Sequence, residues 1–199
     1  MAVHIIADSS CDIPQSEAAR RGLQVLPFSI HFGTQEYRDG VDITGEKFYQ
    51  LLTTGDVLPT TSQVTPWQFQ EALAVMEEGD EAVILTVSGK LSGTLQSALI
   101  AAKSYGSRVR VVDSLSAAIG LRVQVEYALR LRDAGLDAAA IAEELLARRD
   151  QVVLLGVVVL ASVLLSWTLA RLSRREKMRW LRWLWVLLWM CLWRISKEA

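Results

Sequence analysis

Short β-branched runs that alternate with longer segments of helical periodicity constrain this chain more than any other feature. The runs predict strands over 3–7, 82–87 and 109–112, with a shorter extended run over 24–32. Helices are expected over 15–21, 45–52, 66–77, 91–105, 115–133 and 137–148, with Thr65 and Asp137 as N-caps. This alternation predicts an α/β fold, in which a mostly parallel sheet is covered by helices on both faces.

The expected strands run into small hydroxyl or acidic residues. The first is followed by Asp8, Ser9 and Ser10, the second by SGKLSGT at 88–94, and the third by Asp113 and Ser114; the cluster PTTSQ at 59–63 precedes a helix. Parallel sheets bind ligands at the carboxyl ends of their strands, and hydroxyls beside helix N-termini favour anions. We therefore expect four clusters on one sheet edge to form a cradle for a carboxylate or phosphate. The same residue types are also the usual helix caps.

Enzymatic alternatives are weaker. Asp8 follows a strand, as in phosphatases that attack with an aspartate, but Ser10 stands where the second, acid-base aspartate should be. Cys11 is a candidate nucleophile, yet neither His4 nor His31 is close to it in sequence. A hydrolase or phosphatase that uses Asp8 or Cys11 is therefore the second interpretation.

Cofactor and metal sites are not expected. The segment SGKLSGT lacks the GxxxxGK[ST] pattern of nucleotide-binding loops. The two cysteines, Cys11 and Cys191, are too far apart in sequence to indicate a disulfide framework or a metal-ligand spacing.

Six segments together resemble the DegV family of bacterial proteins. They are IIADSSCDIP, LPFSIHFGTQEYRDGVDIT, EKFYQLL, LPTTSQVTP, VSGKLSGTLQSA and VRVVDSLSAAIGL. Their order and spacing match the N-terminal lobe of that family over residues 3–158. The joint presence of the TSQ, LSGT and VDS elements makes the resemblance specific.

The resemblance implies a cytoplasmic carrier that binds a long-chain fatty acid and presents its carboxylate to a separate fatty acid kinase, not an enzyme. Thr61 of TSQ and Ser92 of LSGT match the hydroxyls that hold the carboxylate, and we expect both at the start of helical segments. Supporting and capping roles are expected for the surrounding motif residues, which are Asp8, Ser9, Ser10, Ser62, Gly93, Thr94, Asp113 and Ser114. Asp8 should accept hydrogen bonds from backbone N–H groups, since its charge would repel a carboxylate. No nucleic acid partner is expected.

The last quarter of the chain differs in composition from the rest. Residues 1–150 contain 13 Lys and Arg against 20 Asp and Glu, whereas residues 151–199 contain 8 against 2, together with six of the seven tryptophans. We expect a DegV-like α/β lobe over 1–150 and an apolar helical tail over 151–199. The family's GGRIS element and second lobe, which supply an arginine and a histidine at the ligand head group, have no counterpart in this tail.

Three origins of the tail remain open: a membrane anchor, an interaction helix, and a truncated or frameshifted reading frame. Its 19 uncharged residues at 152–170 are long enough to span a bilayer, but the six basic residues that follow would then lie outside the cell. We prefer the frameshift, because the family match stops inside a core strand, and a fragment without function is a further alternative. The lobe is expected to be cytoplasmic, because no signal peptide precedes it, with membrane contact through 152–194.

Overall fold

A four-stranded parallel sheet forms the centre of the computed structural model, which describes residues 2–153. In spatial order its strands are β2 (Leu23–Leu26), β1 (Val3–Asp8), β6 (Glu81–Thr86) and β7 (Val109–Asp113). The parallel pairing confirms the α/β class that the sequence predicts. Because strands in such sheets are buried on both sides, the middle of β1 (residues 5–7) and of β6 (residues 82–85) is continuously apolar.

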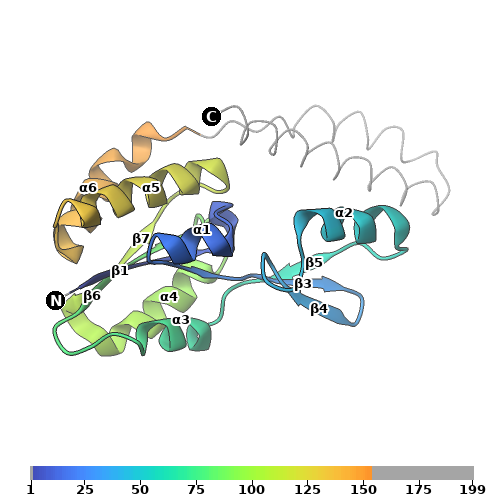
Figure 1. Cartoon of the computed structure of the whole chain (residues 1–199), viewed down its shortest axis with the longest axis horizontal. Coiled ribbons are helices and arrows are strands. Elements are labelled where there is room, and N and C mark those ends of the chain that lie inside the picture. The colour runs from blue at the N-terminus through green and yellow to red at the C-terminus, as the bar shows by residue number, and fades with distance from the viewer. Residues whose placement is uncertain (1, 154–199) are drawn as a thin grey trace.

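Helices cover both faces of this sheet, as Figure 1 shows. One face is covered by α1 (Gln15–Arg20), α5 (Ile119–Asp133) and α6 (Ala138–Arg148), and the other by α3 (Pro66–Leu73) and α4 (Thr94–Ala102). The alternation of side chains along β1 separates two apolar cores, since Ile5 packs toward α5 and Ile6 toward α3 and α4. The predicted caps are present: Thr65 begins α3 in a capping box with Gln68, and Asp137 caps α6.

A second, smaller sheet lies beside the first and is antiparallel. It contains β4 (Gln35–Arg38), β3 (Ser29–Phe32) and β5 (Thr60–Ser62) in that order, with α2 (Gly45–Thr54) over it (Figure 1). The prediction of one extended run over 24–32 is wrong, because β2 ends at Leu26 and β3 begins at Ser29 in the other sheet. Pro27 lies at the break, where its missing N–H group cannot continue a ladder.

Two helices begin later than the sequence predicts. Helix α4 begins at Thr94 rather than at 91, because the N–H groups of Leu91 and Ser92 bond to the carbonyl of Ser88 in a tight turn. Helix α5 begins at Ile119 rather than at 115, and Leu115 and Ala118 have positive φ angles of 50° and 48° that no α-helix contains. Helix α3 ends at Leu73, four residues before the predicted end.

Short 3-10 helices complete the described part: η1 (Ser9–Cys11), η2 (Lys103–Arg108) and η3 (Arg149–Gln151). The predictions of a helical tail and of a membrane segment at 152–170 fall almost wholly outside the described residues. Within residues 2–153, no helix is both long enough and apolar enough to cross a bilayer.

Candidate functional site

A cavity of about 470 Å³ opens between the two sheets and contains both predicted ligand-binding hydroxyl residues, Thr61 and Ser92. Its lining comes from the β2–β3 link, from β5 and the residue after it, and from the segment between β6 and α4: Phe28, Thr61, Gln63, Val87, Leu91, Ser92 and Gly93. Two polar hydroxyls thus share one hollow with three apolar side chains. Its seven lining residues include no lysine or arginine.

Thr61 reaches the cavity from the edge strand of the small sheet. It lies in β5 opposite Ile30 of β3. The prediction that Thr61 stands at the start of a helical segment is wrong, because β5 precedes α3 and the helix begins only at Pro66. Ser62, the next residue, points to the opposite side of the strand, where its Oγ lies 2.9 Å from Nε2 of His31, so the structure does not bring Ser62 into the cavity.

Ser92 lies two residues before the first residue of α4. Its Oγ accepts a hydrogen bond from the backbone N–H of Thr94 at 3.2 Å and lies 2.9 Å from the Thr94 hydroxyl. When the buried Thr94 hydroxyl donates to Ser92, the Ser92 proton is left to bond to a ligand. Gly93, the N-cap residue of α4, lines the cavity, whereas Thr94 does not line it and supports Ser92 through these hydrogen bonds.

Asp8 is fully buried at the end of β1 and does not line the cavity. As expected, it accepts hydrogen bonds from backbone groups: its Oδ2 bonds to the N–H of Val87 at 2.7 Å, and its Oδ1 accepts from both the N–H and the hydroxyl of Ser10. Burial raises the pKa of Asp8, and the hydrogen bonds from Ser10 and Val87 oppose that shift. The Asp8 carboxylate therefore fixes the main chain of Val87, which is a residue of the cavity wall.

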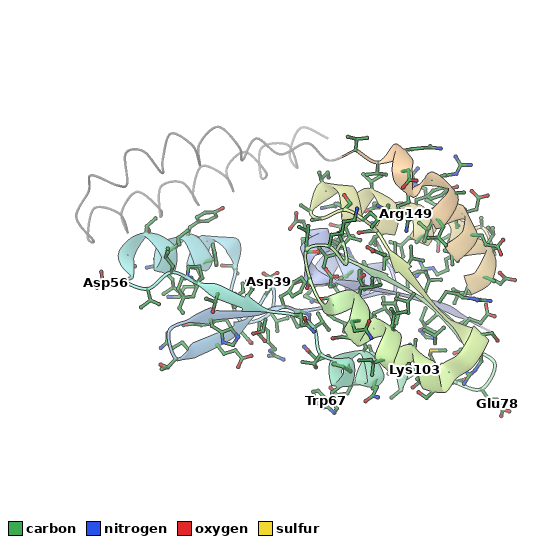
Figure 2. The ribbon with its side chains drawn as sticks, turned by 180° about the vertical axis from the view of Figure 1, so that it is seen from behind. Asp39, Asp56, Trp67, Glu78, Lys103 and Arg149 are labelled. Atoms are coloured by element: carbon green, nitrogen blue, oxygen red, sulfur yellow. The ribbon has the colours of Figure 1, made fainter. Side chains whose placement is uncertain are left out.

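Ser9 supports a second wall residue in the same way. Its Oγ accepts from the N–H of Phe28 at 3.1 Å and donates to Oδ2 of Asp39 at 2.7 Å. Figure 2 shows Asp39 near the junction of the two sheets, and its own N–H bonds to the Phe28 carbonyl at 2.9 Å. Ser9 and Asp39 together fix the main chain of Phe28 on both sides.

Asp113 and Ser114 hold the loops next to Ser92. Asp113 Oδ1 accepts from the N–H groups of Gly89 and Leu115 at 3.1 and 3.0 Å. Ser114 is buried and its hydroxyl bonds to both the N–H and the carbonyl of Ser116, whose carbonyl in turn accepts from the N–H of Ser88. These bonds connect the end of β7 to the turn that carries Ser92.

Four wall residues were not predicted from the sequence: Phe28, Gln63, Val87 and Leu91. Phe28 and Val87 resemble ordinary core residues in the sequence. Gln63 belongs to the TSQ element, and its position there is the one signal that pointed to it. The expectation that four clusters converge on one sheet edge is wrong in one respect, because Thr61 reaches the cavity from the second sheet.

Neither candidate nucleophile is exposed. Cys11 is fully buried, and burial raises the pKa of its thiol to about 12. Asp8 is equally inaccessible, with both carboxylate oxygens bonded. Among residues 2–153, no group of three His, Cys, Asp or Glu side chains is placed to hold a metal ion.

Comparison with known proteins links this chain to one family. A family model described as the uncharacterised DegV family matches residues 2–161. A DegV domain-containing protein of Deinococcus radiodurans is 36% identical over 146 residues, which are 73% of this chain and 52% of that protein. The chain thus spans about half the length of the curated relatives it matches.

Solved structures share the fold. A DegV family protein of Thermus thermophilus, described by its fatty acid binding, is 36% identical with a TM-score of 0.69, over 75% of this chain and 54% of that one. A DegV lipid-binding protein of Thermotoga maritima is 28% identical with a TM-score of 0.66, over 76% of this chain and 55% of that one.

Proposed function

Because this chain belongs to the DegV family, we propose that its cavity binds the carboxylate of a long-chain fatty acid and that the protein is a carrier, not an enzyme. The observation that carries the proposal is the pairing of Thr61 and Ser92 in one hollow, although they come from different sheets. The description of the Thermus thermophilus relative as a fatty acid binder supports the same ligand class.

The cavity suits an amphiphile because it offers hydroxyls and apolar side chains together. Two neutral O–H donors can bond to a carboxylate, while Phe28, Val87 and Leu91 can contact the first methylenes of the acyl chain. A hydrogen bond to a charged group contributes about 1.5–3 kcal/mol. With no cation among the lining residues, these hydroxyls would provide the main polar attraction within residues 2–153.

The rest of the acyl chain would extend beyond this hollow. The relatives are about twice as long as the matched part of this chain. We therefore propose that residues 2–153 supply half of a fatty acid site and that the other half lies in protein surface comparable to the remainder of those relatives. We also propose that the protein delivers the fatty acid to a fatty acid kinase, that it is located in the cytoplasm, and that it contacts the membrane through residues 152–194.

The geometry does not favour hydrolysis. Attack by an aspartate or a thiolate requires an ionised nucleophile that can reach the substrate. Asp8 is fully buried and bonded to the Val87 N–H, and the raised pKa of Cys11 keeps its thiol protonated at neutral pH.

Fatty acid titration of the full chain tests the proposal. Thr61→Val and Ser92→Ala should each weaken binding by roughly ten- to a hundredfold, because each removes a hydrogen bond to a charged group. The matched controls Thr34→Val and Ser107→Ala alter exposed residues outside the cavity and should bind like the wild type. Cys11→Ser should also bind normally. The proposal fails if the wild type retains no fatty acid, or if only Cys11→Ser abolishes binding.

A further inference from the structure

Gln63 bridges the two elements that carry the predicted ligand-binding hydroxyls. It follows β5, two residues after Thr61, and its Nε2 donates a 3.0 Å hydrogen bond to Oγ of Ser97 in α4. Ser97 is almost fully buried, with 2% of its surface exposed, so this contact anchors Gln63 to the helix interior. The bond spans 34 positions in the sequence and joins the small sheet to α4.

The path of this side chain runs directly over Gly93. A Cβ atom added to Gly93 would lie 2.2 Å from Oε1 of Gln63 and 3.0 Å from its Cδ, far inside contact distance. Gly93 has φ −74°, which any residue adopts, so its backbone conformation does not require glycine. The close approach of Gln63 is what excludes a side chain here.

We propose that Gln63 is a positioning residue, which fixes the spacing between the Thr61 and Ser92 hydroxyls by tying the end of β5 to the first turn of α4. This inference rests on the proposed function, since the spacing matters only for a ligand that both hydroxyls contact. A carboxylate accepts hydrogen bonds on both of its charged oxygens, whereas the alkoxy oxygen of an ester is a poor acceptor and carries an alkyl group. Two hydroxyl donors at the correct spacing therefore favour the free acid. The hydrogen bond between Gln63 and Ser97, called here the clamp, therefore contributes to recognition of the free acid over its esters.

A double-mutant cycle between Gln63 and Gly93 tests the inference. In the full chain, Gln63→Ala should weaken binding of a long-chain fatty acid about tenfold, and that of its methyl ester by less than about twofold. Gly93→Ala should have the same effect by displacing Gln63. The double variant should again lose about tenfold rather than about a hundredfold, because the second change removes nothing that the first has left in place.

Controls separate positioning from stability and from ligand class. Gln96→Ala changes an exposed residue of the same type on α4 and should bind both ligands like the wild type. Equal losses for acid and ester, or additive losses in the cycle, would overturn the inference. If Thr61→Val weakens binding and Gln63→Ala does not, the clamp alone is wrong; if neither matters, the proposed function falls as well.

Discussion

Replacement of Asp8 should destabilise the fold even though Asp8 does not line the cavity. In Asp8→Ala the N–H of Val87 loses its 2.7 Å partner, and Val87 is only 5% exposed, so water cannot readily replace it. An unpaired buried N–H costs about 1–3 kcal/mol, which corresponds to a fall in melting temperature of roughly 2–12 °C for a chain of this size. Urea unfolding followed by far-ultraviolet circular dichroism measures the loss.

Asp8→Asn separates the hydrogen bond from the charge. The amide oxygen can still accept from Val87, and the Ser10 hydroxyl can rotate to accept from the new NH2 group, so this variant should lose less than Asp8→Ala.

The charge adds a pH dependence of known sign. Because burial raises the pKa of Asp8 above 3.8, its contribution to stability is complete below pH 3.8 and is lost as the pH rises through the folded-state pKa. The stability gap between wild type and Asp8→Asn should therefore narrow with rising pH. An Asp8→Ala variant as stable as the wild type, or a gap that widens with pH, would refute this reasoning.

Three further predictions concern the reactivity of Cys11 and the stability contributions of Phe69 and Asp80. Cys11 should resist iodoacetamide at pH 8 in the folded chain and react in urea, because its pKa is raised to about 12; peptide mapping by mass spectrometry would detect modification in the native state. Phe69→Ala should lower the free energy of unfolding, measured in urea, by about 3–5 kcal/mol, since the Phe69 side chain of α3 is fully buried in the core. Hydrogen bonds from Ala2, His4 and Glu77 lower the pKa of Asp80 to about 2. The free energy that ionised Asp80 adds to the folded state is therefore present above pH 3.8 and is lost as the pH falls toward 2. Asp80→Asn should reduce this acid-induced loss of stability when the free energy of unfolding is measured as a function of pH.

The main sheet and its helices could be predicted because their signals are local. β-branched runs mark β1, β6 and β7, and the caps at Thr65 and Asp137 mark helix starts through their own side chains. The late starts of α4 and α5 could not be predicted, because the local turns before them are also tied to each other by hydrogen bonds between segments far apart in sequence, such as the bond from the Ser88 N–H to the Ser116 carbonyl. Gly89 and Leu115, for example, bond to the same oxygen of Asp113.

The small sheet escaped prediction for a different reason. All three residues of β5 are exposed and β4 is nearly so, which leaves no apolar alternation to recognise. Their strand character comes from pairing with β3, a long-range interaction without a local pattern. As a result the sequence predicts Thr61 at the start of a helical segment, although Thr61 lies in β5 and its place in the cavity depends on the pairing of β5 with β3.

The candidate site could be predicted only in part. Motif resemblance pointed to Thr61 and Ser92, which the structure places together, and their ligand-binding roles stay predictions. The hydrogen bonds between Asp8 and Val87 and between Ser9 and Phe28 could not be predicted from the sequence. Their donors are backbone N–H groups, which every residue type except proline has.

Main-chain anchoring of the cavity wall also bears on how cargo preference can diverge. Asp8 and Ser9 bond to the backbone N–H groups of Val87 and Phe28. The side chains at positions 87 and 28 can therefore be exchanged without loss of these hydrogen bonds. Under the proposed function, a change at these two positions would alter which acyl chains fit while the ADSS segment at 7–10 stays the same. For directed evolution, positions 28 and 87 are the sites to randomise, and positions 8 and 9 are the ones to hold constant.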